Sequence, residues 1–234
     1  MERVTAETFE TAENITELYE HQHVRTRHKL TAGQRAYLPV KRFFDIVLSI
    51  IGLVISAPFL PIIALLIKLD SPGSVFFHQE RVGNDGYTFT IHKFRTMKAN
   101  MEDWRLSLSA EEQEAFEKDY KLVNDPRITR LGRFLRKTSI DEIPQLLNIL
   151  AGELSLIGPR PLVSDELSKY GNQEHLFLSV KPGLTGYWQV NGRNDTTYEQ
   201  RIDMELHYAR NFSLAMDITI FIKTFTAILR KTGA

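Results

Sequence analysis

The sequence contains no cysteine, so a disulfide framework, a thiol nucleophile and a cysteine metal site are excluded. Its 29 basic and 29 acidic residues cancel, so the overall charge predicts no polyanionic partner such as a nucleic acid. The chain also lacks a P-loop and the GxGxxG, HExxH and GxSxG motifs. It therefore carries none of the common signatures of nucleotide-binding, zinc-peptidase or serine-hydrolase sites.

The charges that are present are unevenly distributed near the N-terminus. Residues 1–20 carry six Glu and one Arg, whereas residues 21–44 carry six Lys or Arg and no acid. An acidic segment followed by a basic one, just before an apolar run, is typical of a cytoplasmic arm near anionic lipid. The first 40 residues are too polar for a secretory signal peptide. We assign residues 1–38 to a polar N-terminal arm.

A long uncharged run follows this arm. Residues 46–67 would form a helix roughly 33 Å long, enough to cross a hydrocarbon core. Pro58 and Pro61 interrupt it, and each removes a helical hydrogen bond. Basic residues flank both sides, among them Arg42 and Lys68, so the positive-inside rule does not orient the segment.

Two topologies remain open for this run when only its residues are considered. It is either a straight span or a re-entrant hairpin that breaks near Ser56 and Pro58 and returns to the cytoplasm. In the hairpin, freed backbone carbonyls need local partners such as the Ser56 hydroxyl. Asp45, at the entry, is expected to pair with a neighbouring cation, because an unpaired carboxylate there is costly.

The rest of the chain predicts an α+β fold, mainly α with a small β-hairpin. The hairpin is expected over residues 74–97, where β-rich runs flank "GNDG". Residues 109–123 predict an exposed helix. Loops rich in Gly are expected over 152–162 and 180–194. Residues 212–231 predict an amphipathic helix that packs on the core or lies in the membrane interface.

The stretch "TSIDEIPQLLN" places Asp141 and Glu142 side by side at the expected first turn of an apolar helix. One interpretation is a capping box between Ser139 and Glu142. The other is phosphate chemistry. Consecutive helical residues point about 100° apart, so one carboxylate can attack phosphorus while the other holds a divalent cation. The arginines spaced every three residues over 127–136, together with Arg160, would neutralise a diphosphate.

Several segments in order resemble one known family: "KRFFD", "IKLDSPGSVFFHQERVG", "HKFRTM", "NDPRITRLGRFLRKTSIDEIPQLLNIL", "GELSLIGPRP", "KPGLTGYWQVNGR" and "DMELHYARNFSLAMDI". Over about residues 39–234 the chain is similar to the bacterial sugar transferases, which are polyisoprenyl-phosphate hexose-1-phosphate transferases. The resemblance implies transfer of a sugar-1-phosphate from a UDP-sugar to undecaprenyl phosphate, with release of UMP and with Mg²⁺ as cofactor. It also implies a role in initiating surface glycan synthesis.

The resemblance further implies a membrane-embedded re-entrant helix hairpin at 39–68. A cytoplasmic catalytic domain with amphipathic interfacial helices would follow at 69–234, on the cytoplasmic face of the bacterial inner membrane. The membrane break falls at Ser56 and Pro58, and Ala57 stands where the family has its serine. A homo-oligomer is compatible with this interpretation.

Carried over residue by residue, the family's roles make Asp141 the nucleophile on the sugar-bearing phosphorus and Glu142 the Mg²⁺ ligand. Lys93 is a further catalytic residue. The expected substrate-binding residues are Arg160, Pro161, Arg95, Arg136, Asp203, Gln189 and Arg193. A membrane-anchored scaffold without chemistry is the alternative, but it leaves "SIDEIPQ" and "GPRPL" without a role. No residue decides which sugar is moved.

Overall fold

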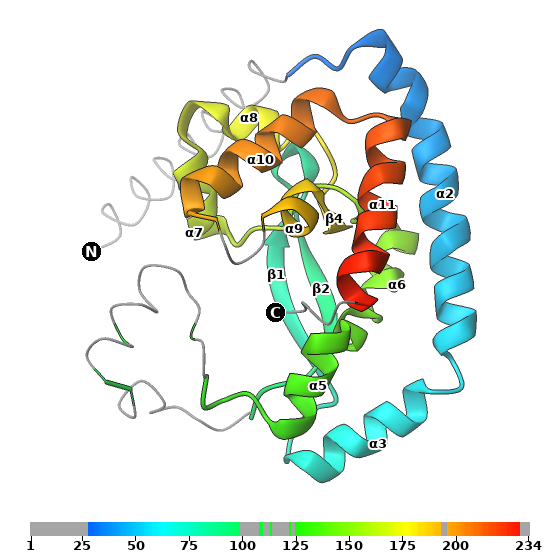
Figure 1. Cartoon of the computed structure of the whole chain (residues 1–234), viewed down its shortest axis with the longest axis vertical. Coiled ribbons are helices and arrows are strands. Elements are labelled where there is room, and N and C mark those ends of the chain that lie inside the picture. Colours follow the sequence, from blue (N-terminus) through cyan, green and yellow to red (C-terminus); the bar gives the residue numbers. More distant parts are fainter. Residues whose placement is uncertain are drawn as a thin grey trace, which may run out of the picture.

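A computed structural model describes residues 28–98, 108–109, 113, 122, 125–192 and 196–229. Most of the helix predicted over 109–123 lies outside these residues. The predicted α+β class is confirmed, since helices surround a small central hairpin (Figure 1). The helices are α2 (Ala32–Ser56), α3 (Leu60–Asp70), α5 (Arg130–Thr138), α6 (Gln145–Ala151), α7 (Ser164–Leu167), α8 (Glu174–Phe177), α9 (Tyr187–Asn191), α10 (Tyr198–Asn211) and α11 (Leu214–Leu229). The strands are β1 (Phe76–Val82), β2 (Thr88–Phe94), β3 (Ser155–Ile157) and β4 (Gly183–Thr185), and the 3₁₀ turns are η1 (Asn84–Gly86), η3 (Ile140–Glu142) and η4 (Ser168–Gln173).

The uncharged run forms a bent pair of helices. α2 begins inside the predicted arm, because Thr31 and Gln34 form a capping box at its N-terminus. The chain breaks after Ser56, where the prolines predict it, and α2 and α3 meet at 65°. Among the described residues no single helix has the length and apolarity to cross a membrane, whereas α2 and α3 together meet that requirement as a bent pair.

The Ser56 hydroxyl takes part in the break. Its Oγ donates to the Leu53 carbonyl at 3.1 Å, and the backbone N–H of Ala57 donates to the same oxygen at 2.8 Å. The carbonyl that Pro58 deprives of its helical partner is that of Val54, four residues earlier. Ser56 therefore reinforces the last turn of α2 at a neighbouring carbonyl.

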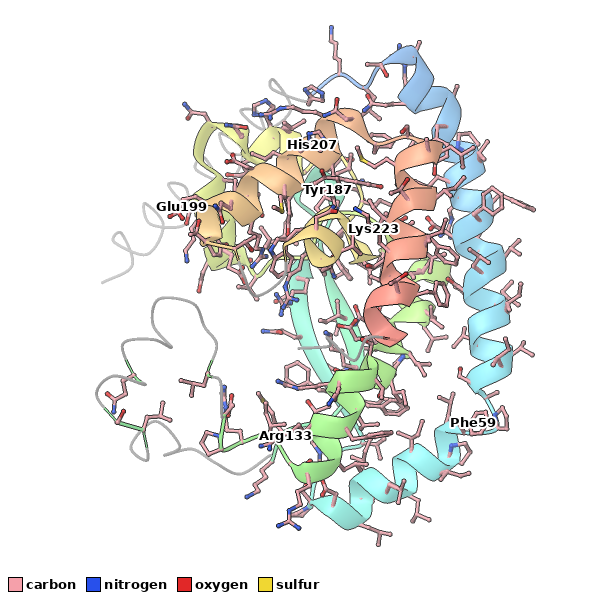
Figure 2. The ribbon with its side chains drawn as sticks, viewed as in Figure 1. Phe59, Arg133, Tyr187, Glu199, His207 and Lys223 are labelled. Atoms are coloured by element: carbon pink, nitrogen blue, oxygen red, sulfur yellow. The ribbon has the colours of Figure 1, made fainter. Side chains whose placement is uncertain are left out.

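One side of the bent pair presents apolar side chains to its surroundings. In Figure 2, Phe59 is labelled at the bend, at the periphery of the molecule. Exposed apolar area of this extent marks an interaction surface on a membrane or a partner. The exposed apolar side chains of this apolar face are Leu38, Val40, Phe43, Phe44, Ile50, Ile51, Val54, Ile55, Phe59, Ile62, Leu65, Leu66 and Leu69.

The opposite side of α2 is joined to the body by buried polar contacts. Lys41 Nζ pairs with Asp217 Oδ2 at 2.6 Å. Arg42 donates from Nη1 to the Ile149 carbonyl at 2.5 Å and from Nη2 to the Leu150 carbonyl at 2.9 Å. These carbonyls lie at the C-terminal end of α6, where a cation also meets the negative end of the helix dipole. The two cations therefore hold α2 to α11 and α6.

The predicted pairing of Asp45 with a cation is wrong. Asp45 is 5% exposed, and its Oδ1 accepts from the Ser155 hydroxyl at 3.0 Å and from the Leu156 N–H at 2.8 Å. The neighbouring Lys41 is paired with Asp217 instead. Hydrogen bonds from β3 thus satisfy this buried carboxyl group.

The predicted hairpin is confirmed. β1 and β2 pair antiparallel, with Phe77 opposite Lys93. The turn needs left-handed backbone at Asp85, with φ 58°, and at Gly86, with φ 83°. The two predicted loops are in part regular structure: the segment over 152–162 contains β3, and the segment over 180–194 contains β4 and α9. β3 and β4 pair in parallel.

The C-terminal helix α11 packs on the core along one side and leaves an apolar side exposed. Ile220 is 1% exposed and belongs to the main hydrophobic core. Leu214, Ile218, Ile222 and Phe225 are exposed, at spacings that put them on one side of the helix.

Arg95, a predicted substrate-binding residue, instead joins β2 to the end of α3. Its guanidinium is 8% exposed. Nη2 donates to the Ser71 carbonyl at 2.6 Å and to the Ile67 carbonyl at 3.4 Å, and Nη1 donates to the Pro72 carbonyl. The structure therefore uses Arg95 to satisfy carbonyls where α3 ends.

We expect Arg95→Met to lower the free energy of unfolding by about 2–4 kcal/mol, because buried carbonyls lose their donor. Chemical denaturation of the detergent-solubilised chain measures this loss. Arg133→Met is the matched control, since Arg133 is exposed on α5 (Figure 2). Full stability with impaired substrate binding would instead support the role predicted from the sequence.

Candidate active site

The acidic pair lies in the 3₁₀ turn η3, between α5 and α6, and not in the first turn of the apolar helix. Ser139 ends α5 in the left-handed conformation, with φ 55°, and its side chain makes no capping bond to η3. The predicted capping box from Ser139 to Glu142 is therefore wrong, because a capping box needs extended backbone at the cap residue. Asp141 is 7% exposed, and the Glu142 side chain is 29% exposed.

α6 holds this turn against the hairpin through Asn148, which is 1% exposed. Its Oδ1 accepts from the His92 N–H at 3.2 Å, and its Nδ2 donates to the Thr90 carbonyl at 2.8 Å. The next residue of β2, Lys93, donates from Nζ to Glu142 Oε1 at 2.6 Å. The docking of α6 on β2 thus places a lysine beside the acidic pair.

Arginines form a second group of side chains, on the side opposite Lys93 and Glu142. The Val82 N–H donates to the Leu162 carbonyl at 2.8 Å, which joins the end of β1 to the "GPRPL" segment. Arg81 Nη1 donates to the Pro161 carbonyl at 3.1 Å. Burial and the neighbouring Arg160 guanidinium lower the pKa of Arg81 to about 10. Within the described part of the chain, no hydrogen bond or ion pair holds the Arg160 side chain.

Two glycines allow the "GPRPL" segment to approach β4. A Cβ on Gly158 would lie 2.4 Å from the Lys181 carbonyl oxygen, and a Cβ on Gly183 would lie 2.0 Å from the Gly158 nitrogen. Neither distance is compatible with a side chain. Gly158 N donates to the Thr185 carbonyl at 2.9 Å and Gly183 N to the Pro159 carbonyl at 2.8 Å. This close approach sets Arg160 at the edge of the cleft.

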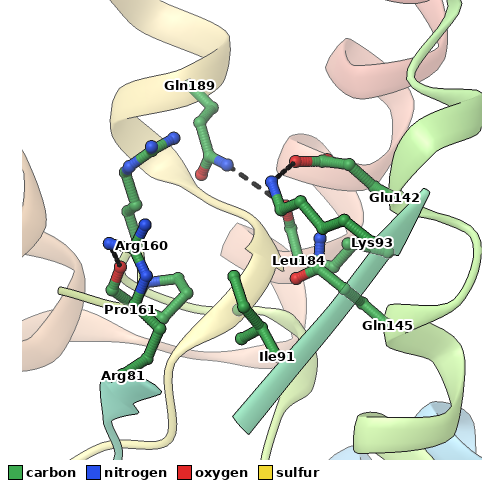
Figure 3. Close-up of a pocket in the computed structure, with 10 residues that line it drawn as sticks. Arg81, Ile91, Lys93, Glu142, Gln145, Arg160, Pro161, Leu184 and Gln189 are labelled. Carbon is green, nitrogen blue, oxygen red and sulfur yellow. Dashed lines mark hydrogen bonds and ion pairs between the residues drawn. The ribbon is translucent and has the colours of Figure 1, made fainter. Parts of the chain in front are cut away.

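The walls line an open cleft (Figure 3). Figure 3 shows the Lys93–Glu142 pair on one side and Arg81, Arg160 and Pro161 on the other. Gln189 lies between them, and its Nε2 donates to the Leu184 carbonyl at 3.1 Å. The residues lining the cleft are Arg81, Ile91, Lys93, Glu142, Gln145, Arg160, Pro161, Gly183, Leu184 and Gln189.

Burial raises the pKa of Asp141 to about 6, and the negative charge of Glu142 adds to this effect. Lys93 and Arg136 act in the opposite direction and favour the carboxylate. Arg136 is itself fixed, because its Nε donates to the Thr96 hydroxyl at 2.8 Å. Asp141 therefore stays mostly ionised at neutral pH, although burial and Glu142 destabilise its charged form. Lys93 and Arg136 reduce that destabilisation.

The structure brings together most of the predicted site residues. Lys93, Glu142, Arg160, Pro161 and Gln189 line one cleft, with Asp141 and Arg136 close to its acidic side. Two predicted residues do not join them, and a third is not described. Arg95 is engaged at the end of α3, Asp203 is exposed on α10, and Arg193 lies outside the described residues.

Sequence reasoning missed a buried network behind the arginine wall. Glu166 lies 3.9 Å from Arg81 Nη1 and 3.5 Å from Arg201 Nη2. Arg201 Nε also pairs with Glu205 at 3.2 Å, and both residues are at least nine-tenths buried. The i,i+4 spacing of Arg201 and Glu205 was a readable signal for this pair. The acidic residue of α10 that faces the interior is thus Glu205 and not Asp203.

The donor set limits how a metal ion could be held. Within the described part of the chain, no group of three or more His, Asp or Glu side chains is placed to bind a metal. Mg²⁺ commonly binds one or two carboxylates together with substrate phosphates and water. Asp141 and Glu142, next to a cationic cleft, fit a Mg²⁺ ion that arrives with a diphosphate, with Glu142 as the accessible ligand.

Comparisons with known proteins agree on one family. A family model described as "Bacterial sugar transferase" matches residues 36–231. An undecaprenyl-phosphate galactose phosphotransferase of Salmonella typhimurium is 43% identical over 220 residues, which cover 93% of this chain and 46% of that protein. A UDP-glucose:undecaprenyl-phosphate glucose-1-phosphate transferase of Escherichia coli is 39% identical over 203 residues, covering 83% of this chain and 41% of the relative.

A shorter relative matches along most of its length. The exopolysaccharide production protein ExoY of Sinorhizobium fredii is 41% identical over 197 residues, covering 83% of this chain and 87% of that protein. The chain therefore spans less than half of the Salmonella and Escherichia relatives and most of this one.

The raised pKa of Asp141 predicts how stability depends on pH. Between about pH 4 and 6 the folded state holds more protons than the unfolded state, so stability falls as pH rises through that window. We expect Asp141→Asn, which is always neutral, to raise the free energy of unfolding at pH 7.5 by up to about 3 kcal/mol. The gain should shrink towards pH 4.

Chemical denaturation at pH 7.5 and at pH 4.5 measures both effects. Asp165→Asn controls for the change in net charge, since Asp165 is exposed on α7. A loss of stability in Asp141→Asn at neutral pH would contradict the electrostatic account.

Proposed function

The chain belongs to the bacterial sugar transferase family, and from this we propose that it transfers a sugar-1-phosphate from a UDP-sugar to undecaprenyl phosphate, releasing UMP. The names of its Salmonella and Escherichia relatives specify undecaprenyl-phosphate acceptors with galactose or glucose. The observation that carries the proposal is the buried Asp141 beside Glu142 and Lys93, which line a cleft opposite Arg160. The product, undecaprenyl-diphosphate-sugar, would start exopolysaccharide, capsule or O-antigen synthesis.

The chemistry proceeds in two displacements at one phosphorus atom. A carboxylate oxygen of Asp141 attacks the sugar-bearing phosphorus, and the bond from that phosphorus to the bridging oxygen breaks as UMP leaves. An oxygen of undecaprenyl phosphate then attacks the same phosphorus, and the acyl-phosphate bond breaks. The second step regenerates the Asp141 carboxylate and completes the diphosphate. A carboxylate nucleophile of this kind divides one difficult step into two easier ones.

The surrounding charges suit each step. Lys93 and Arg136 favour the ionised form of Asp141, which the attack requires. Arg160 has no counter-ion among the described residues, and Arg81 lies next to it, so this wall is suited to phosphate oxygens. The two walls would hold the diphosphate between the attacking carboxylate and the arginines.

Glu142 is the proposed Mg²⁺ ligand. When bound, Mg²⁺ supplies positive charge to the diphosphate as its bridging bond breaks. In the structure the Glu142 carboxylate is paired with Lys93 at 2.6 Å, so Lys93 holds this oxygen in place and partly neutralises it. Lys93 would remain near the phosphate as a second cation once Glu142 turns to the ion.

We further propose that α2 and α3 form a re-entrant hairpin in the cytoplasmic membrane. The bend of 65°, the exposed apolar face and the cationic residues on both sides support this placement. With both ends on the cytoplasmic face, the cleft lies near the headgroups, where a soluble UDP-sugar and a lipid phosphate meet. A straight span starting in the cytoplasm would put Asp141 on the opposite side of the membrane.

The non-catalytic scaffold is the alternative function. It would explain the apolar face of α2 and α3 but not a buried carboxyl group with raised pKa beside a cleft lined by six polar or charged residues. Structural ion pairs also perturb pKa values, so turnover is the deciding observation.

We expect purified, detergent-solubilised protein to release UMP from one or a few UDP-sugars when undecaprenyl phosphate and Mg²⁺ are present. Asp141→Asn should reduce the rate by at least about 10⁴-fold, because the nucleophile is lost. Chelation of Mg²⁺ should abolish release. Asp165→Asn, an exposed acid outside the cleft, is the matched control. Full activity in Asp141→Asn would refute the proposed mechanism, and no UMP from any donor would favour the scaffold.

The membrane topology is testable because the chain has no cysteine, so single-cysteine variants label without background. Arg35→Cys and Asp70→Cys report on the two ends of the bent pair, since both residues are exposed. Arg133→Cys reports on the catalytic body. We expect all three to react with a membrane-impermeant maleimide in inverted vesicles and none in intact spheroplasts. Labelling of either end from outside the cell would contradict the re-entrant hairpin.

A further inference from the structure

The cleft contains buried hydrogen-bond donors that the protein itself does not satisfy. Gln145 is 2% exposed, and its Nε2 has no hydrogen-bond partner among the described residues. Arg81 Nε also has no hydrogen-bond partner among the described residues. Five buried side-chain atoms in the described part of the chain lack a hydrogen-bond partner, and two of them belong to residues that line this one cleft.

Native proteins satisfy nearly all buried polar groups, because leaving a buried donor unpaired is unfavourable. The side chains around Gln145 explain why it lacks an acceptor. Glu142 Oε1 is taken by Lys93 Nζ, and the facing charged groups, Arg81 and Arg160, are donors themselves. Lys93, Arg81, Arg160 and Gln145 therefore give the cleft a surplus of donors over the Glu142 carboxylate, which is complementary to a ligand rich in acceptor oxygens.

The backbone brings Gln145 close to the reacting carboxyl group. Gln145 follows Asp141 by four residues, and Ile143 and Pro144 between them keep right-handed helical dihedrals. The backbone hydrogen bonds of this stretch join residues three apart, so Asp141 and Gln145 lie about one turn from each other along the chain. Figure 3 shows Gln145 beside Lys93 and below Glu142 in the cleft.

We propose that the Gln145 carboxamide donates a hydrogen bond to a non-bridging oxygen of the phosphoryl group that Asp141 attacks. This assignment rests on the proposed transferase function. As the bond from Asp141 to phosphorus forms and the bond to UMP breaks, negative charge spreads over the phosphoryl oxygens. A donor already fixed by burial stabilises that charge without reorganisation. Gln145 would thus be a catalytic residue that no charge pattern reveals.

Two variants separate a catalytic donor from a packing residue. Gln145→Met keeps an unbranched side chain of similar length and removes the donor. We expect its kcat for UMP release to fall about 100-fold, as for loss of one oxyanion donor. Its KM for the UDP-sugar should change little, and its melting temperature should stay equal or rise, because an unpaired buried donor is gone. Gln145→Glu adds a negative charge next to the phosphoryl group, so it should be slower still.

Gln173→Met is the matched control, since Gln173 is exposed and does not line the cleft. An unchanged kcat in Gln145→Met would overturn the assignment. A fall in kcat accompanied by a fall in melting temperature would make Gln145 a packing residue. A changed preference among UDP-sugars would place its contact on a sugar hydroxyl instead, and would also overturn it.

Binding of inorganic diphosphate tests the same contact without turnover. The binding is measured through the shift that diphosphate causes in the melting temperature. We expect about 10-fold weaker binding in Gln145→Met than in the wild-type chain and in Gln173→Met. The chain could release no UMP and yet bind diphosphate in a way that depends on Gln145. That result would refute the proposed function but keep the contact between Gln145 and phosphate. UMP release that depends on Asp141, with diphosphate binding and kcat both independent of Gln145, would refute only the contact.

Discussion

The architecture of the cleft depends on keeping one carboxylate charged inside the protein beside a second one. Burial and Glu142 both oppose ionisation of Asp141, whose pKa is raised to about 6. The cations that limit this effect come from distant parts of the chain, Lys93 from the hairpin and Arg136 from the end of α5. The hairpin, α5 and α6 must therefore dock correctly before the acidic pair can exist as a charged site.

Sequence predicted those parts of the fold whose cause is local. The "GNDG" turn and its flanking β-rich runs were enough for the hairpin, and Pro58 was enough for the bend after α2. The β3–β4 pair was missed because Ser155 and Gly183 meet only through tertiary packing around two glycines. Single-residue partners were missed for the same reason, as when Asp45 was satisfied by β3 and not by a cation.

The same distinction between local causes and tertiary packing applies to the candidate site. Family motifs singled out Lys93, Glu142 and Arg160, because each motif brings its own charged residue, and all three line one cleft. Arg95 carries the same charge within the same motif as Lys93, yet it serves the end of α3, and only its buried carbonyl partners reveal this. A neutral residue such as Gln145 gives no charge signal at all, so its place in the cleft required the packing of α6.

The contacts of Arg42 hold the turn that carries Asp141 in a fixed position relative to α2. Arg42 holds the last carbonyls of α6, and α6 is only seven residues long and begins three residues after Glu142. Asp141 is therefore held at a fixed distance from α2. If α2 lies in the membrane as proposed, the acceptor phosphate must reach that position by itself. The length of a lipid's headgroup linkage would then select acceptors before any side chain contacts them.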